Sequence, residues 1–326
     1  MRVLITGANG FVGQALTRRL LALGHVRGER ITLLRLLDTR FDTALEDPRV
    51  RRHEGSVADA ALLRRVLADG IDVVFHLVSI AGGTAERDYP LGYQVNLLAS
   101  LELLEQLRQA GNCPVLVFAS SVAVYGAALP ARMDEQAPAR PALSYGAHKR
   151  MIEIAIEDLA RRGEVDGRAL RLPGIVARPP TPNGLRSAFM SELLHSYAAG
   201  QPYTCPVSPQ ATAWWMSVNC CADNFIRAAE VAGVSADAGR VWQLPVLRLS
   251  IAEVVDALAD RYGEAGRARL RYDPDPELER LFGAYPVLRA PRARALGLRH
   301  DGTASALVRN ALNLTPAPKR ALHGVQ

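Results

Sequence analysis

The sequence predicts an α/β fold in which a doubly wound parallel sheet is followed by a smaller C-terminal domain. In the first half of the 326-residue chain, short apolar runs alternate with segments of helical periodicity. The runs are continuously apolar, which is typical of parallel strands buried on both faces. After Pro173 the sequence changes to proline-rich loops between helical segments, which indicates a second unit.

The predicted elements of the first half follow the chain in order. Each predicted strand is an apolar run that leads into turn residues or a helical segment. The strands span residues 2–6, 31–37, 50–54, 72–78, 114–120 and 168–173. The helices are predicted near residues 11–23, 59–69, 91–110 and 145–162.

The second half has weaker periodicity. Residues 178–184 and 205–210 are predicted loops because prolines recur in them. Helices are expected near residues 185–199, 217–232 and 250–262, and a short strand at 241–244. Residues from Pro316 are expected to form a frayed tail.

Composition excludes several classes of protein. Apolar residues make up 49% and charged residues 22%, as in ordinary globular proteins. The net charge is 39 − 33 = +6, but the arginines are scattered, so we expect no nucleic-acid partner. No apolar run reaches about 18 residues, so no membrane span is expected. A strand begins at once, which leaves no room for a signal peptide and predicts a cytoplasmic protein.

The four cysteines predict neither a metal site nor disulfides. Cys113, Cys205, Cys220 and Cys221 lack the C-x-x-C spacing of zinc ligands. Adjacent cysteines are also a poor disulfide pair. We therefore expect four reduced packing residues and no metal.

A glycine-rich turn follows the first predicted strand. Gly7, Gly10 and Gly13 open an apolar helix, and this context is what a dinucleotide pyrophosphate requires. The alternative is a tight strand–helix turn without a ligand. Asp38 ends the second strand, where a carboxylate accepts hydrogen bonds from ribose hydroxyls and disfavours a 2′-phosphate. NAD is therefore expected, although Arg35 and Arg40 lie close by in sequence.

Lys149 is one of only two lysines among 39 basic residues, the other being Lys319. It follows Tyr145 by four residues, so both side chains lie on one face of the predicted helix. A nearby ammonium lowers the pKa of a phenol, which would otherwise stay near ~10. Ser120 and Ser121 end a parallel strand, where open α/β sheets bind ligands. Tyr-x-x-x-Lys also occurs by chance on helix surfaces.

Together these motifs resemble the extended short-chain dehydrogenase/reductase family, whose fold is a Rossmann domain with a smaller substrate-binding domain. The resemblance implies that Ser121, Tyr145 and Lys149 are catalytic. Ser56 stands where the family usually has an adenine-contacting aspartate. The implied NAD contacts are Gly7, Asn9, Gly10, Phe11, Val12, Gly13, Asp38, Ser56, Val57, Leu77, Val78, Asn96, Ser120, Tyr145, Lys149, Pro173, Ile175 and Val176.

Several stretches, including residues 88–96, 163–179, 205–209 and 292–297, resemble the D-erythronate dehydrogenase sub-family. This implies NAD-dependent oxidation of a short sugar acid at C2, with Tyr145 as general base. A carboxylate suits an arginine, and Arg178 and Arg186 are candidates. The implied substrate contacts are Ser79, Ser121, Tyr145, Asn183, Ser187 and Trp214.

The resemblance also implies a domain division and a homodimer. The NAD-binding domain would comprise residues 1–180 and about 217–246. The substrate-binding domain would comprise about 181–216 and 247–316, and 317–326 would be a tail. The dimer would form through helices near 97–110 and 145–162, where Leu101, Leu104, Ile152 and Ile156 suit either an interface or the core.

Two other functions remain open from the sequence. A nucleotide-sugar epimerase or dehydratase uses the same serine, tyrosine and lysine with tightly bound NAD, but needs a cationic grip on a diphosphate. Arg271 and Asp273 come nearest to such a motif. A non-enzymatic dinucleotide sensor is the second alternative, although such proteins usually lose the tyrosine or lysine.

Overall fold

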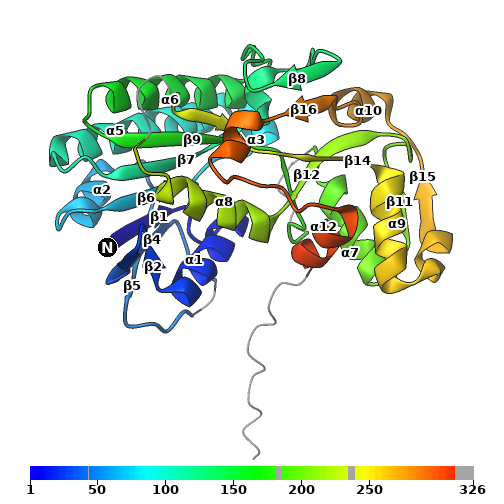
Figure 1. Ribbon diagram of the computed structural model, residues 1–326, viewed down its shortest axis with the longest axis horizontal. Coiled ribbons are helices and arrows are strands. Elements are labelled where there is room, and N and C mark those ends of the chain that lie inside the picture. The colour runs from blue at the N-terminus through cyan, green and yellow to red at the C-terminus, as the bar shows by residue number, and fades with distance from the viewer. Residues whose placement is uncertain (43, 181–185, 234–238, 313–326) are drawn as a thin grey trace, which may run out of the picture.

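The computed structural model describes residues 1–42, 44–180, 186–233 and 239–312. Its largest element is a seven-stranded sheet in which all neighbouring strands are parallel (Figure 1). The chain starts in the middle of the sheet and winds out to both edges, which confirms the predicted doubly wound fold. The spatial order is β13 (Val241–Gln243), β9 (Asp166–Leu172), β7 (Val115–Ser121), β6 (Val73–His76), β1 (Arg2–Thr6), β4 (Leu33–Asp38) and β5 (Val50–Glu54).

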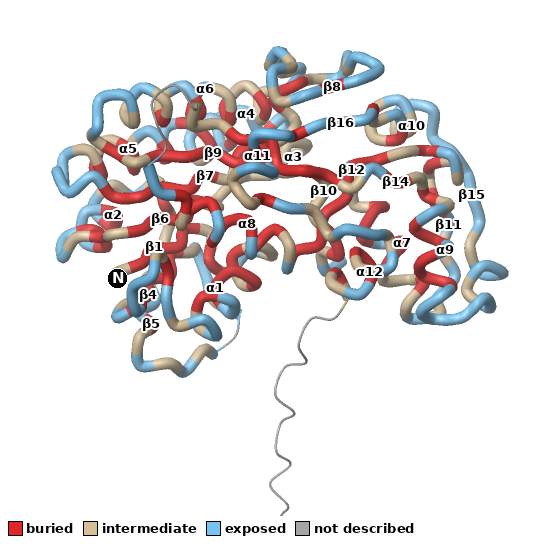
Figure 2. The backbone as a smooth tube through the Cα atoms, in the orientation of Figure 1, coloured by how far each residue is buried: buried red, intermediate tan, exposed pale blue. Residues whose placement is uncertain are grey.

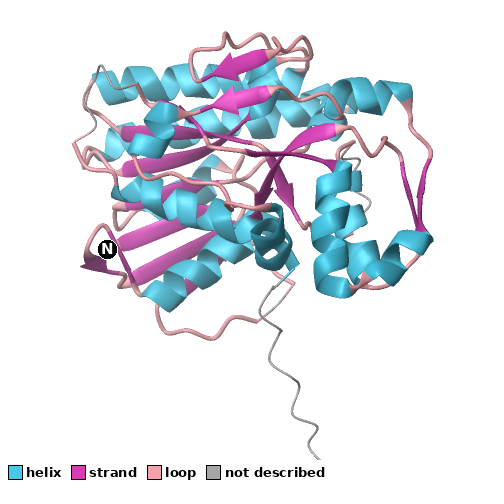
Figure 3. Cartoon of the chain, turned by 45° about the vertical axis from the view of Figure 1, so that its right-hand side comes forward, coloured by secondary structure: helices cyan, strands magenta, loops and turns pink. Residues whose placement is uncertain are grey.

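Helices cover both faces of this sheet (Figure 3). Side chains alternate along a strand, so Val3 and Ile5 of β1 face one layer and Leu4 faces the other. The first layer contains α1 (Phe11–Leu23) and α8 (Val218–Glu230). The second contains α2 (Ala60–Leu67), α5 (Ala99–Ala110) and α6 (Ser144–Arg161). Burial on both faces explains why the strands are apolar throughout (Figure 2).

The predicted helix near 91–110 is built from three pieces. Its first turns are α4 (Tyr89–Gly92), followed by a π-helix, η1 (Tyr93–Leu98), and then α5. A π-helical turn takes more residues than an α-helical turn and often occurs at functional sites. Here it carries the buried Asn96.

A smaller lobe follows the sheet. Its three strands, β10 (Gly174–Val176), β12 (Thr212–Ser217) and β14 (Leu247–Ser250), form a separate sheet. Three helices, α7 (Phe189–Ala198), α9 (Ile251–Tyr262) and α12 (Ala304–Leu312), pack with it around a separate core. β10 lies before residue 180, so the smaller sheet draws on residues that the sequence assigned to the first domain. The proposed domain boundaries stay a prediction.

Shorter elements connect distant parts of the chain. Strand β8 (Arg132–Asp134) pairs with β16 (Val287–Arg289), and β11 (Tyr203–Cys205) pairs with β15 (Leu270–Tyr272), although each pair is far apart in sequence. Sequence periodicity does not register such short, edge-located segments. The remaining elements are β2 (His25–Val26), β3 (Glu29–Arg30), α3 (Gly82–Arg87), η2 (Val122–Tyr125), η4 (Glu264–Arg269), α10 (Pro276–Phe282) and α11 (Pro291–Ala295).

Two expectations from composition have direct structural counterparts. Over the described ranges, no helix is both long and apolar enough to cross a bilayer. All four cysteines are free thiols. Cys205 and Cys221 are buried, but Cys113 is exposed, so the prediction of a packing role is wrong for Cys113.

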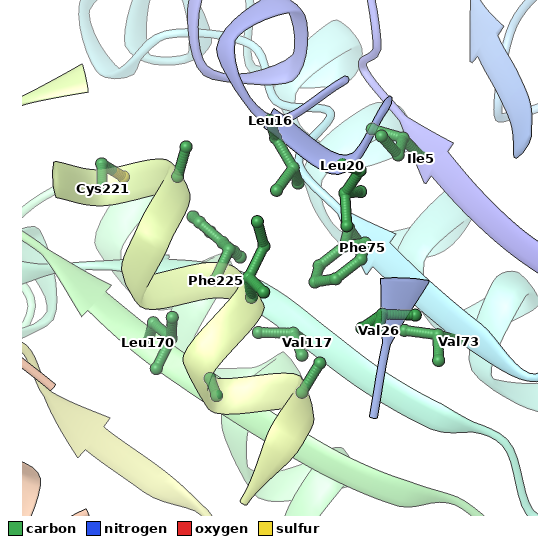
Figure 4. Packing of buried hydrophobic residues seen from close by; sticks show 14 of the residues in the cluster. Ile5, Leu16, Leu20, Val26, Val73, Phe75, Val117, Leu170, Cys221 and Phe225 are labelled. Atoms are coloured by element: carbon green, nitrogen blue, oxygen red, sulfur yellow. The ribbon is translucent and has the colours of Figure 1, made fainter. Parts of the chain in front are cut away.

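The helix α8 is fixed to the sheet by aromatic packing. Phe225 meets Phe75 edge to face, with ring centroids 6.4 Å apart, and both side chains are fully buried near Leu16 (Figure 4).

We expect Phe225→Ala to lower the free energy of unfolding by about 3–5 kcal/mol, because it leaves a cavity. Denaturant titration measures this change. Leu23→Ala, at a more exposed position of α1, is the control and should cost less than about 1 kcal/mol; equal losses would contradict the packing role.

Candidate active site

A cleft of about 1500 Å³ runs along the carboxyl ends of the central strands. It is lined by the turns after β1, β4, β6, β7 and β9, and by Met190, Phe282 and Tyr285 of the smaller lobe. Ligands of open α/β sheets bind at this edge. The volume exceeds the ~300–1,000 Å³ of a usual small-molecule pocket, so a dinucleotide and a small substrate both have room.

The turn after β1 fits a dinucleotide phosphate. A Cβ on Gly13 would lie 2.1 Å from the Gly7 carbonyl oxygen, and Gly7 has φ +72°, so side chains are excluded from both positions. The N-terminus of α1, which begins after Gly10, has no side-chain cap and no acidic residue in its first turn. Its free N–H groups and dipole are therefore open to an anion entering the cleft.

Asp38 lies at the end of β4, in the cleft. Its carboxylate accepts hydrogen bonds from the backbone N–H of Asn9, at 2.8 Å, and of Thr39, at 2.7 Å. These bonds fix its position and leave acceptor capacity for ribose hydroxyls. Arg35 does not counter this carboxylate, because it is buried and pairs with Asp69 at 2.5 Å. Arg40 is exposed and lies 3.4 Å from Asp42.

Tyr145 and Lys149 occupy the first turns of α6, and Ser121 ends β7 opposite them. Burial raises the pKa of Tyr145, while hydrogen bonds with Ser79 and Ser121 and the charge of Arg178 lower it. The sequence predicts that Lys149 lowers the pKa of Tyr145, but Lys149 is not among the groups that lower it. In the structure the Lys149 ammonium lies over the Tyr145 ring, 5.6 Å from its centroid, and 4.6 Å from the Phe118 centroid.

Lys149 is almost fully buried, with 2% of its surface exposed. Burial lowers the pKa of its ammonium to about 7, and the negative charge of Glu153 partly opposes this shift. Glu153 follows Lys149 by one further turn, so residues 145, 149 and 153 share one face of α6. Glu153 is not among the site residues predicted from the sequence, although its four-residue spacing from Lys149 is a signal that could have found it.

Glu153 is a fully buried carboxylate inside a polar network. It accepts bonds from Arg171 Nε at 2.9 Å and Nη2 at 2.8 Å, and from Ser120 Oγ at 2.5 Å. Arg171 also donates to the Tyr125 hydroxyl at 3.1 Å. A buried charge requires such complete pairing, because an unpaired one is strongly destabilising. The network therefore fixes the floor of the cleft beneath Lys149.

Most residues expected at the site do line the cleft. They are Gly7, Asn9, Gly10, Phe11, Val12, Gly13, Asp38, Ser56, Val57, Leu77, Val78, Ser79, Ser120, Ser121, Tyr145, Lys149, Pro173, Ile175, Val176, Ser187 and Trp214. Asn183 lies outside the described residues.

In three of the residues expected to contact a ligand, the polar groups already form hydrogen bonds within the protein. Asn96 does not line the cleft; its amide bonds the backbone of Ile80, accepting at 2.7 Å and donating at 3.1 Å, and so holds the loop that carries Ser79. The Ser120 hydroxyl is committed to Glu153. Trp214 is buried, packs against the ring of Tyr285 with centroids 4.6 Å apart, and donates its indole N–H to the backbone carbonyl of Pro286, so its polar group is not available to a ligand.

We expect Lys149→Met to stabilise the unliganded protein while abolishing activity. The pKa of Lys149 is about 7 in the folded chain against a usual value of 10.5, so folding below pH 7 desolvates a charged ammonium. The gain in unfolding free energy should be largest, on the order of several kcal/mol, at and below pH 7. It should shrink as pH rises from 7 towards 10.5, because the unfolded lysine then also loses its proton.

Denaturant titrations of both proteins at pH 6, 8 and 9.5 measure this gap. The control is Arg161→Met, at the exposed last residue of α6, which pairs only with the exposed Asp158 among the described residues and should show no such pH dependence. If Lys149→Met and wild type had the same free energy of unfolding, or if their difference grew with pH, burial of the charged ammonium would not be destabilising and the prediction would be contradicted.

Comparison with known proteins agrees with this geometry. Residues 3–237 match the NAD dependent epimerase/dehydratase family. A D-erythronate dehydrogenase of Cupriavidus necator is 38% identical, covering 95% of this chain and 97% of the relative. Another, from Haemophilus influenzae, is 32% identical and covers 92% and 95%. The structure of a nucleoside-diphosphate-sugar epimerase from Agrobacterium tumefaciens is similar, with TM-score 0.87 and 30% identity over 95% of this chain and 92% of that one.

These matches confirm the predicted oxidoreductase class and NAD as the cofactor. The family model covers the whole glycine turn, the Ser–Tyr–Lys set and α8, and the two dehydrogenases extend over the smaller lobe as well. The chain therefore belongs to the NAD dependent epimerase/dehydratase family.

Proposed function

We propose that this chain oxidises D-erythronate, or a closely related short 2-hydroxy sugar acid, at C2. The observation that carries the proposal is the placement of Tyr145 in the cleft, where side-chain hydrogen bonds with Ser79 and Ser121 lower the pKa of its hydroxyl. This arrangement suits removal of a proton from an alcohol. The proposal of a sugar acid as substrate is supported by the two D-erythronate dehydrogenases. They resemble the chain over nearly its full length, which includes the smaller lobe.

In this mechanism the substrate hydroxyl lies between Ser121 and Tyr145. The Tyr145 phenolate accepts the hydroxyl proton, and Ser121 donates a hydrogen bond to the same oxygen as its charge changes. NAD, when bound, supplies the acceptor for the hydride from C2. Lys149 holds a ribose hydroxyl and places positive charge beside the phenol. The product is a 2-oxo acid.

The epimerase alternative has less support in the geometry. A nucleotide sugar needs a cationic grip on its diphosphate. Arg271 of the nearest motif lies on β15 and does not line the cleft. The sensor alternative is disfavoured because Tyr145 and Lys149 are both present and meet in the cleft. Similarity to the Agrobacterium epimerase keeps the first alternative as an outcome of the test.

Purified protein with excess NAD is expected to form NADH with D-erythronate in a panel of tetronic and related sugar acids. Tyr145→Phe should lower kcat at least about 1,000-fold, because the general base is lost while the ring remains. Fluorescence of bound NADH checks that the variant still binds the cofactor. A parallel panel of UDP-, GDP- and dTDP-sugars covers the alternative. Conversion of a nucleotide sugar without redox turnover of any acid would overturn the proposal.

We also propose a cytoplasmic homodimer. Of the four apolar positions predicted for the interface, Leu104, Ile152 and Ile156 are buried in the core of the protomer, and only Leu101 is exposed. Four exposed apolar side chains nevertheless lie on η1, α5 and α6. They are Leu98, Leu101, Met151 and Ile154. Four reduced cysteines support the reducing compartment.

Sedimentation equilibrium should show a dimer that Ile154→Glu converts to monomer, because a charge at this half-exposed position would be desolvated in the interface. Leu23→Glu, at an exposed position of α1, is the control and should remain dimeric. A monomeric wild type, or equal behaviour of the two variants, would contradict an α5–α6 interface.

A further inference from the structure

Arg178, which is half-buried, differs from the three arginines that are buried in the described part of the chain. Arg35, Arg168 and Arg171 are each at least nine-tenths buried, and each pairs with a carboxylate, at 2.5, 2.6 and 2.8 Å. Arg178 lines the cleft, and within the described ranges no carboxylate lies at ion-pair distance from it. Its Nε is buried without a hydrogen-bond partner. A buried donor of a charged group that lacks a partner is costly, which indicates that an anion from outside the chain completes its hydrogen bonding.

The backbone of Arg178 is held from both sides by α7. Its N–H donates to Ser191 Oγ at 3.0 Å, and its carbonyl oxygen accepts from His195 Nε2 at 2.9 Å. The guanidinium lies over the ring of Phe11, 5.1 Å from the centroid. The side chain thus has a fixed origin in the smaller lobe and a fixed place against the first helix of the sheet domain.

Arg178 and Tyr145 line the same cleft, and the charge of Arg178 acts on the Tyr145 hydroxyl. It lowers the pKa of Tyr145, and the Tyr145 phenol in turn opposes the lowering of the Arg178 pKa by burial. In a 2-hydroxy acid the carboxylate carbon is bonded to the carbon that bears the reacting hydroxyl. A cation that binds this carboxylate must therefore lie in the same part of the cleft as Tyr145, and Arg178 lines that cleft and acts on the charge of Tyr145.

We propose that Arg178 binds the C1 carboxylate of the substrate and thereby selects acids over neutral polyols. This inference rests on the proposed oxidation of a 2-hydroxy acid. Arginine suits the task because its planar guanidinium donates two parallel hydrogen bonds to one carboxylate. The same contact orients C2, so it contributes to positioning as well as to affinity.

The second candidate from the sequence, Arg186, has a different environment. It also lines the cleft but is exposed, and Glu277 of α10 already pairs with it at 3.0 Å. An exposed pair of this kind contributes little and does not require an anionic ligand. Arg186 is therefore the matched control for Arg178.

The experiment compares wild type with Arg178→Gln, Arg178→Lys and Arg186→Gln. KM and kcat are measured for D-erythronate and for its neutral amide, and KM is measured for NAD. Inhibition by oxamate, an unreactive 2-oxo carboxylate, reports carboxylate binding apart from turnover. Thermal unfolding and the fluorescence of bound NADH establish that each variant is folded and binds cofactor.

Arg178→Gln is expected to raise KM for the acid and the oxamate inhibition constant about 10- to 100-fold, as loss of a charge-assisted hydrogen-bond pair predicts. Its preference for acid over amide should collapse. Arg178→Lys should lie between the two, because it keeps the charge without the fork. Arg186→Gln should match wild type, and KM for NAD should change less than about threefold in every variant.

Other results overturn the inference in distinguishable ways. If wild type oxidises no acid, the proposed function fails and this inference fails with it. If wild type oxidises the acid but both Arg178 variants keep its KM, only the inference fails. If KM for NAD rises instead, Arg178 belongs to the cofactor phosphates. Should Arg178→Gln not fold, an unchanged acid KM in Arg178→Lys would overturn the inference and a raised one would support it.

Discussion

Burial of the Lys149 ammonium is the constraint on which the site depends. The side chain lies between α6 and the end of β7, over the ring of Phe118, with 2% of its surface exposed. A charge in this position lowers the stability of the chain, and its pKa falls to about 7 as a result. The chain tolerates this because Glu153, one turn further along α6, supplies negative charge from within a fully paired network.

The Glu153 network also includes Arg171, a residue of the strand that leads from the large sheet into the smaller lobe. Arg171, on β9, reaches Glu153 and Tyr125, and β9 leads directly into the Pro173–Val176 stretch and then Arg178. The same face of α6 that orders the network presents Tyr145 to the cleft. Burial of Lys149 therefore lowers the free energy of unfolding, and the paired groups around Glu153 oppose this loss. Such a local cost in stability is common at active sites.

Much of this could be predicted from the sequence because the information is local. Strands β1, β6 and β7 are continuous apolar runs, the glycine turn at Gly7–Gly13 has a backbone requirement, and Tyr145 and Lys149 share a helix face. The smaller lobe could not be predicted in detail, because strands such as β8 and β16 gain stability only by pairing with distant partners. The Arg171–Glu153 pair is similarly non-local, as is the insertion of Trp214 against Tyr285. Asn96 was expected at the cofactor, but the π-helix η1 turns its amide onto the loop at Ile80.

The most direct test of this account is an NMR titration of the Lys149 side chain in unliganded protein labelled only at lysine. The sequence has two lysines, Lys149 and Lys319. The signal that is lost in the Lys149→Met variant therefore identifies the Lys149 resonance in the wild-type spectrum. We expect a titration midpoint near 7 in wild type and a lower midpoint in Glu153→Gln, because removal of the carboxylate leaves the effect of burial on the pKa of Lys149 unopposed. A midpoint near 10.5, or one that Glu153→Gln does not change, would contradict this expectation.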